Sequence, residues 1–195
     1  MMNLNALKVD PEFQGKIPPL TFEELNQLEA NILRDGRIIN PIIVWEGLIV
    51  DGHNRFIIAK KHPEIPYTVH ETEFANRYEA IIWICKNQLG RRNLSPEQKR
   101  YLLGKQYESE KKAEKIFHGN QYTLAKKSGG SHDDTHHSGK KTCDRIAEEN
   151  GVSRASVLRA QHYTKGVDIA DTDIPSPRKT AILFNRMASS SENTL

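Results

Sequence analysis

The sequence predicts an α+β protein, in which a domain built on a small mixed sheet is followed by an all-α domain. Short β-rich runs occur at 41–45, 48–50 and 66–73, and stretches with apolar residues at helical spacing lie between them. From Cys143 to Gln161 the pattern is typical of a helix-turn-helix. Residues 119–140 are rich in Gly, Ser, His, Lys and Asp, which predicts a flexible linker.

Turn and capping signals define the first elements. Leu4 to Val9 is a candidate edge strand. Thr21 and Glu24 form a capping box, which begins a helix that ends near Gly36. The apolar residues at helical spacing in this helix are Phe22, Leu25, Leu28 and Ile32.

The next segment alternates between strands and helices. The runs 41–45 and 48–50 are joined by a Glu-Gly turn and predict a hairpin. We then expect a helix from Phe56 to about His62, a strand from Pro66 to Glu73, and a helix from Ala75 to Leu89. The apolar face of the last helix carries Tyr78, Ile81, Ile82 and Cys85.

The remaining elements are helical. Ser95 and Gln98 form a second capping box, and the helix that it begins runs to about Phe117. Thr142 is expected to cap the first helix of the helix-turn-helix, and a last helix should cover Arg178 to Met187. The expected parts are a domain at 1–92, a connecting helix at 93–118, the linker at 119–140 and a helix-turn-helix domain at 141–190.

Composition bounds the class of protein. The chain has 195 residues, of which 37% are hydrophobic and 27% charged, so we expect one or two domains. No apolar run approaches the length of a membrane span, and no signal peptide is visible after Met1. Cys85 and Cys143 lie far apart without neighbours at metal-ligand spacing, so we expect reduced thiols in a cytoplasmic protein with no membrane partner.

Charge is distributed unevenly along the chain. Residues 1–85 carry 8 Lys and Arg against 12 Asp and Glu, a net charge of −4, whereas residues 86–195 carry 20 against 13, a net charge of +7. This asymmetry favours nucleic acid as a partner of the C-terminal half. Solvated helix faces are the alternative.

The linker contains histidines with metal-ligand chemistry. They are His132, His136 and His137, beside Asp133 and Asp134. Their surroundings of Gly, Ser and Lys provide no apolar frame and no groups to orient the ligands, so a solvated linker is expected and no metal site.

The helix-turn-helix pattern is complete at its core positions. Gly151 permits the left-handed backbone of the turn, and Ala147 provides the small residue where the two helices touch. The flanking core positions are Ile146, Val152, Val157 and Ala160. Ser153 caps the second helix, whose solvent face offers Ser153, Arg154, Ser156, Arg159 and Gln161. These side chains suit phosphates and base edges in the major groove of double-stranded DNA, which a homodimer would read as two half-sites. An ordinary helical hairpin is the alternative.

A second motif, Asp-Gly-His-Asn-Arg, spans Asp51 to Arg55 where a strand ends and a helix begins, a natural place for a phosphate. Gly52 lets the backbone approach a ligand, and Arg55 can grip a phosphate through two hydrogen bonds. His53 can donate to a phosphate or shuttle a proton, and Asp51 can accept a hydroxyl proton or help hold a metal ion. The alternative is a tight turn in which Asp51 caps the helix and Arg55 makes a structural salt bridge.

The order of these elements, together with Asn87 to Pro96 and the helix-turn-helix, resembles the ParB/Spo0J family of partition proteins over about residues 5–165. It looks closest to the shorter ParB-like proteins of plasmids, phages and mobile elements. The resemblance implies a ParB/sulfiredoxin-like domain followed by a helix-turn-helix domain, with a role in partition, replication control or transcriptional regulation. It also implies a nucleotide ligand, often CTP, with candidate contacts at Gly52, His53, Asn54, Arg55, Asn87, Arg91 and Arg92.

The sequence also departs from that family. Where partition proteins carry Gly-Glu-Arg-Arg, this chain has the Asp51 to Arg55 segment. Lys86 stands where the family carries a Glu that helps hold magnesium, so the resemblance speaks against a magnesium site.

Two enzyme branches share the implied fold. In sulfiredoxins a cysteine stands where His53 stands here, which excludes cysteine sulfinate reduction. A branch that phosphorylates free serine carries Asp-Gly-His-His-Arg, from which this chain differs at Asn54, and it implies Asp51 as the base. A non-enzymatic DNA-binding protein is therefore the main expectation, and a phosphotransferase or CTP/ATP hydrolase that uses Asp51 is the alternative.

Overall fold

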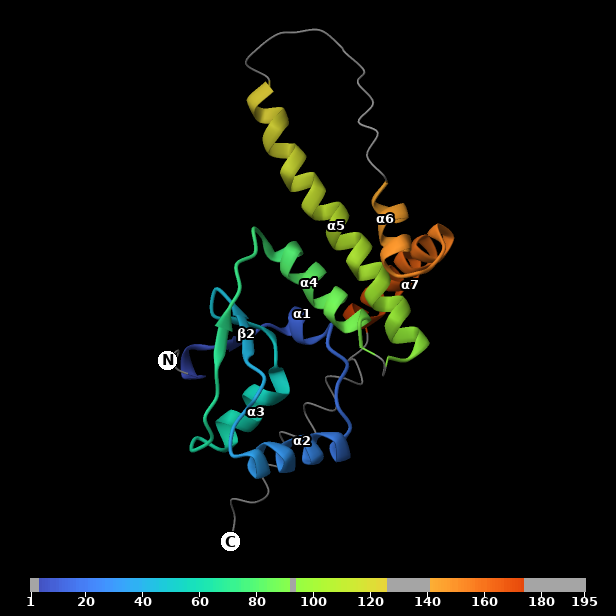
Figure 1. Ribbon diagram of the computed structural model, residues 1–195. Helices are drawn as coiled ribbons and strands as arrows, with labels where there is room; N and C mark the ends of the chain where they lie inside the picture. The colour runs from blue at the N-terminus through green and yellow to red at the C-terminus, as the bar shows by residue number, and fades with distance from the viewer. Residues whose placement is uncertain (1–3, 92–93, 126–140, 174–195) are drawn as a thin grey trace.

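The computed structural model describes residues 4–91, 94–125 and 141–173, which form a small sheet covered by helices and a helical part beside it (Figure 1). The sheet domain contains a 3₁₀ turn (Leu4–Ala6), β1 (Lys8–Val9), α1 (Pro11–Gln14), α2 (Phe22–Asp35), β2 (Ile42–Trp45), β3 (Leu48–Asp51), α3 (His53–Lys61), β4 (Val69–Glu71) and α4 (Arg77–Leu89). The helical part contains α5 (Pro96–Ala125), α6 (Thr142–Glu149) and α7 (Arg154–Asp173). The predicted α+β class is confirmed.

The sheet is mixed and has the strand order β1-β3-β2-β4. β2 and β3 form the predicted antiparallel hairpin, while β1 pairs with β3 and β4 pairs with β2 in parallel. Both outer strands are shorter than expected, because only Lys8–Val9 and Val69–Glu71 find partners in register. A 3₁₀ turn takes the place of the first residues of the expected edge strand.

The two capping boxes predicted from the sequence are confirmed. In α2, the Glu24 amide donates to Thr21 Oγ1 (3.2 Å) and the Thr21 amide to the Glu24 carboxylate (2.8 Å). Gly36 ends this helix in the left-handed region, with a φ of 65°. Ser95 and Gln98 make the same reciprocal pair of hydrogen bonds at the start of α5.

Three expected positions were wrong in detail. Phe22 is 73% exposed and does not belong to the hydrophobic cluster that Leu25, Leu28 and Ile32 join. α3 begins at His53 rather than at Phe56, because Gly52 turns the chain directly from β3 into the helix. α4 begins at Arg77, because the Asn76 side chain accepts hydrogen bonds from the amides of the first turn.

Helix α5 contributes to two hydrophobic cores. Leu102 packs with Val50 of the sheet and Ile81 of α4, and its neighbour Leu103 packs with Ile146 and Val157 of the helix-turn-helix. In Figure 1, α4 lies between the sheet and α5, and α6 and α7 lie against the other side of α5. The two domains are therefore built around one shared helix.

Some predicted features lie outside the described residues. The expected last helix, 178–187, and residues 126–140 of the expected linker are not among those described. The first residues of that linker belong to α5, which continues past its expected end at Phe117 to Ala125. Within the described residues, no three His, Cys, Asp or Glu side chains gather as a metal ion would require. No described helix is long and apolar enough to cross a membrane.

Candidate functional site

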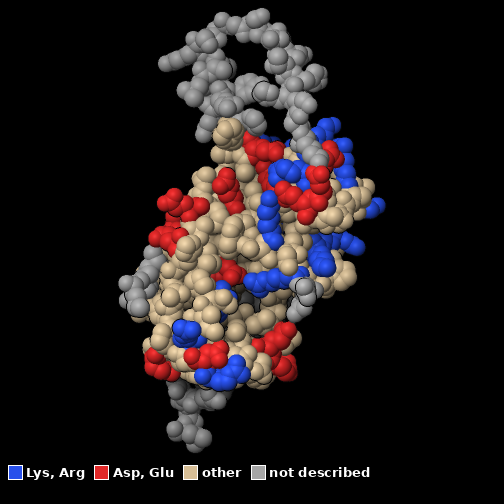
Figure 2. Space-filling model, in the orientation of Figure 1, with Lys and Arg blue, Asp and Glu red and all other residues tan. Residues whose placement is uncertain are grey.

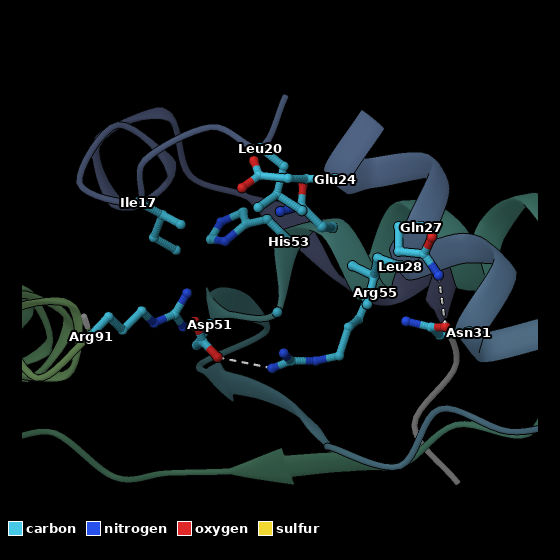
Figure 3. A pocket seen from close by; sticks show the side chains of 12 residues that line it. Ile17, Leu20, Glu24, Gln27, Leu28, Asn31, Asp51, His53, Arg55 and Arg91 are labelled. Atoms are coloured by element: carbon cyan, nitrogen blue, oxygen red, sulfur yellow. Dashed lines mark hydrogen bonds and ion pairs between the residues drawn. The ribbon is translucent and has the colours of Figure 1, made fainter. Parts of the chain in front are cut away.

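A cavity of about 420 Å³ opens where β3 meets α3 (Figure 3). Its lining includes the predicted residues Asp51, Gly52, His53, Asn54, Arg55 and Arg91. Five of them are consecutive in sequence, whereas Arg91 follows α4 and reaches the cavity only through the tertiary fold. The sequence predicts seven nucleotide contacts and, for the enzyme alternative, Asp51 as the base. Five of the seven contacts share this cavity with Asp51.

The start of α3 presents backbone donors to this cavity. Gly52 is the N-cap with a φ of 93°, and no side chain caps the helix. A Cβ at Gly52 would lie 3.0 Å from Arg55 Nη2, so the turn and the arginine position both depend on glycine. The uncapped amides and the helix dipole make this end of α3 favourable for an anion.

Asp51 holds two arginines at the cavity wall. Arg55 Nη2 donates to Asp51 Oδ2 (2.9 Å) and to the Pro41 carbonyl (3.0 Å), and Arg91 Nη2 donates to Asp51 Oδ1 (3.2 Å). Figure 3 shows Asp51 between the two guanidinium groups. The alternative of a purely structural turn predicts a salt bridge at Arg55 and a helix cap at Asp51. The salt bridge is present, but Asp51 does not cap α3. Arg55 Nε is buried and has no partner within the described residues, so part of its donor capacity is unused.

His53 is buried in the same wall and is only 4% exposed. Burial lowers the pKa of its imidazole to about 4, although the charges of Asp51 and Asp10 act to raise it. Within the described residues, neither ring nitrogen has a hydrogen-bond partner. A neutral imidazole has one donor and one acceptor, and a buried ring with both unpaired has the capacity to bind a polar ligand.

The opposite wall of the cavity comes from α2 and the loop before it, which no motif of the sequence predicts. Leu28 and Leu20 supply apolar surface, and Gln27 Nε2 donates to Asn31 Oδ1 (3.0 Å). Glu24, Gln27 and Asn31 recur at helical spacing in the sequence, but a polar stripe of this kind is usually a solvated face. Only the position of α2 over α3 makes it part of a cavity.

Two predicted contacts are not part of the cavity as described. Asn87 is exposed on α4 and does not line it. Arg92 lies outside the described residues.

The donor set fits phosphate groups better than magnesium. Two guanidinium groups, a helix start and a neutral imidazole converge on the cavity. Its lining carboxylates are Asp51 and Glu24, and both oxygens of Asp51 are already engaged by arginines. Lys86 does not line the cavity and is paired with Glu149 of α6 (3.1 Å).

The second candidate site is the pair α6 and α7. Gly151 has a φ of 63°, as a tight turn between helices requires, and Ala147, Ile146, Val157 and Ala160 are buried as predicted. Ser153 caps α7, and its Oγ accepts from the Ser156 amide (3.2 Å). Two expectations were wrong: Val152 is 38% exposed, and Thr142 is the first residue of α6 and donates to Glu114 rather than capping.

The solvent face of α7 carries most of the predicted side chains. Ser153, Arg154 and Arg159 are exposed, and Ser156 and Gln161 are half-buried. The structure adds His162 and Lys165, which are exposed on the same helix and which the sequence analysis missed. Lys and Arg side chains line the right-hand edge of Figure 2, where α6 and α7 lie in Figure 1.

The fold matches solved structures of ParB N-domains. A pNOB8-like ParB N-domain in its C2221 crystal form gives a TM-score of 0.58 at 20% sequence identity, over 82% of this chain and 66% of that chain. A second structure of a pNOB8-like ParB N-domain gives a TM-score of 0.55 at 20% identity, over 82% and 62% of the two chains. No family model and no curated protein matches the sequence.

The protein therefore has the ParB N-domain fold that the sequence predicted. This chain spans less than two thirds of the length of each of those solved chains. At such low identity the likeness defines the fold, and the function has to be argued from the chemistry of the sites.

Proposed function

We propose that the protein is a ParB-like DNA-binding protein of a plasmid, phage or other mobile element, which acts in partition, replication control or transcriptional regulation. One observation carries the proposal: in a chain with the ParB N-domain fold, a helix-turn-helix with an exposed basic second helix is packed, through α5, onto the sheet domain. Arg154, Arg159 and Lys165 of α7 are exposed, and the helix contains no acidic residue before Asp168. Such a face attracts the phosphate backbone of a duplex.

A direct test is DNA binding by α7 variants. We expect the wild-type chain to bind a labelled random-sequence duplex in fluorescence anisotropy, and selection from a duplex library to yield a preferred site. Arg154→Ala and Arg159→Ala should each weaken binding and lower the salt dependence by about one unit of slope if they contact phosphate. Arg34→Ala, which removes an exposed arginine from α2, is the control. Equal affinities in all four proteins would remove α7 as the DNA reader.

The cavity between β3 and α3 is proposed to hold the phosphate groups of a nucleotide, with CTP as the first candidate. The start of α3 would supply backbone donors, and Arg55 and Arg91 would supply guanidinium groups. The neutral His53 ring would donate to or accept from the same ligand. The protein's contribution in this role is to bind and orient the phosphate groups, and the bound form would act as a switch rather than as a substrate.

Isothermal titration with CTP, ATP and ADP, with and without magnesium, tests the cavity. We expect Arg55→Ala to weaken nucleotide binding by about tenfold or more, because it removes charge-assisted hydrogen bonds. Arg37→Ala is the matched control, since this exposed arginine does not line the cavity. If the wild-type chain binds no nucleotide, the Asp51 to Arg55 segment is a structural turn and the protein has the fold without this ligand.

The alternative function is a nucleotide-dependent phosphotransferase or hydrolase. It is favoured by the position of Asp51, whose carboxylate faces the cavity beside His53. However, both Asp51 oxygens accept hydrogen bonds from arginines, which suits a residue that positions cations better than a free general base. Release of ADP or phosphate that Asp51→Asn abolishes would favour the enzyme. A flat time course with CTP, ATP and ADP, with and without serine, would favour the binding protein.

Self-association is part of the proposal, because helix-turn-helix proteins commonly read palindromic half-sites as dimers. A homodimer would place two copies of α7 one helical turn of DNA apart. Analytical ultracentrifugation with and without the selected duplex measures the oligomeric state, and we expect two protein chains on each duplex.

A further inference from the structure

A second basic surface lies at the start of α5, beside α7. We propose that Lys99 and Arg100 of α5 hold a backbone phosphate of the same DNA duplex that α7 contacts. This inference rests on the proposed DNA binding and extends it to a helix outside the helix-turn-helix motif. Neither residue belongs to a motif of the sequence.

The two residues converge with α7 on one groove. A hollow of about 510 Å³ is lined by Lys99 and Arg100 of α5, by Asn150 at the end of α6, and by Ser156 and Arg159 of α7. Arg159 is also on the exposed face of α7, so it belongs to both surfaces. Three cationic side chains and no carboxylate line this groove.

The three cations of this groove lack the ion pairs that several other cations of the helical part make. Within the described residues, Lys99, Arg100 and Arg159 take part in no ion pair, and Arg159 donates only to the Ser156 hydroxyl (3.3 Å). By contrast, Lys111 pairs with Glu114, and Arg145 pairs with Glu110 and Glu149. Unpaired cations that face one groove repel one another unless an anion joins them, and a phosphate diester supplies that anion.

The Arg100 side chain is already positioned. Its guanidinium lies over the Tyr163 ring of α7, 5.3 Å from the ring centroid. This cation–π contact holds the guanidinium in place without using its N–H groups in an ion pair, so they can donate to a phosphate. The nearest acid in sequence, Glu97, accepts a hydrogen bond from Ser95 Oγ (2.9 Å) at the helix start, although its charge still acts on Arg100.

The crossing of α5 and α7 fixes the distance between the two surfaces. Gly104 of α5 lies so close to the Ala160 carbonyl and to Thr164 Oγ1 that a Cβ would overlap them. Lys99 and Arg100 are on the next turn of α5 from this contact. A duplex seated against Arg154 and Arg159 would therefore bring a flanking phosphate to the first turns of α5.

A charge-matched pair of double variants tests the inference. We compare Lys99→Ala/Arg100→Ala with Lys112→Ala/Lys115→Ala, which removes the same charge from the same helix at residues that do not line the groove, Lys112 lying over the Tyr78 ring of α4. Binding to the labelled random-sequence duplex is measured by anisotropy over a salt series. The first variant should bind at least tenfold more weakly at low salt, with a salt slope lower by about 1–2 units, and the second should match the wild type. Circular dichroism checks that both variants are folded.

A third variant makes the opposite prediction. Glu97→Gln removes the acid next to the groove and should tighten binding, whatever the folding of the alanine variants. The inference is overturned if Lys99→Ala/Arg100→Ala and Glu97→Gln both bind the duplex like the wild type while Arg159→Ala loses affinity. The proposed DNA binding by α7 would then stand. Equal losses in the two double variants also overturn it, because net charge alone would then explain the effect. If the wild-type chain binds no duplex, the proposed function itself fails.

Discussion

At the scale of single residues, His53 has the least ordinary environment in the cavity. Its ring is buried, its pKa is lowered to about 4, and it has no hydrogen-bond partner within the described residues. Such a group costs stability in the free protein and recovers it when a ligand supplies partners. A ligand in the proposed phosphate site would supply the hydrogen-bond partners that His53 lacks within the described residues.

The pKa of His53 predicts a pH dependence of stability. Its value falls from 6.5 to about 4 on folding, so the stability it contributes is complete above pH 6.5 and is lost as the pH falls toward 4. The loss amounts to about 3 kcal/mol. His53→Gln cannot take up this proton. Urea titrations measure the free energy of unfolding of the variant and of the wild type. The difference between them should be constant above pH 7. Between pH 7 and pH 4 the wild type should lose about 3 kcal/mol relative to the variant. A difference that does not change with pH contradicts the assignment.

At the scale of elements, the contact between α5 and α7 determines how the helix-turn-helix is held. Gly104 is buried in the middle of α5, where glycine disfavours a helix, and its missing side chain lets α7 approach. Thr164 Oγ1 donates to the Tyr101 carbonyl of α5 (2.9 Å) across this contact. The position of the basic face of α7 thus depends on one small residue in another helix.

A pair of glycine substitutions separates packing from helix propensity. Gly104→Ala should lower the free energy of unfolding by about 1–3 kcal/mol, because the added Cβ meets backbone that cannot move without separating the helices. A Cβ added at Gly166 of α7 meets no atom within 4 Å, so Gly166→Ala should raise the free energy of unfolding by about 0.5–1 kcal/mol. Urea denaturation followed by circular dichroism measures both. Stabilisation by both substitutions would mean that α5 and α7 do not cross closely in solution.

At the scale of the whole molecule, the sheet domain and the helix-turn-helix share α5. Polar contacts add to the shared cores: Lys16, beside the cavity loop, donates to Tyr101 OH (3.0 Å), which donates to Asp168 of α7 (3.0 Å). Lys105 of α5 also pairs with Asp168. The expected boundary between domains at residues 92 and 141 stays a prediction, and these contacts favour joint unfolding.

Adjacent leucines of α5 test whether the two parts unfold together. Both tryptophans, Trp45 and Trp83, pack against the sheet-domain core, so their fluorescence reports on that domain, while circular dichroism reports mainly on the helices. We expect Leu102→Ala and Leu103→Ala each to cost about 2–5 kcal/mol and to shift both signals together, although they affect different cores. Separate transitions, with Leu103→Ala moving only the dichroism signal, would show independent domains.

Local chemistry explains which features were predictable. The capping boxes at Thr21 and Ser95, the glycine turn at Gly151 and the phosphate-favouring segment at Asp51 to Arg55 each depend on residues within a few positions of one another. Spacing predicts a core position for Val152 and aligns Phe22 with the apolar residues of its helix, yet both side chains are exposed. Periodicity identifies a helix face, but whether another element covers that face is decided elsewhere in the chain.

The α+β class, the succession of the hairpin and the longer helices, and the residues of the two motifs could be read from the sequence, because each follows from short-range propensities, caps and turns, whereas the short helix α1 (Pro11–Gln14) was not predicted. The tertiary structure was needed to show that α2 covers the Asp51 to Arg55 segment to form a cavity and that Arg91 joins it. It also decided that Lys99, Arg100 and Arg159 face one groove. These arrangements depend on contacts between residues far apart in the chain, which packing against a shared helix establishes and which no local pattern encodes.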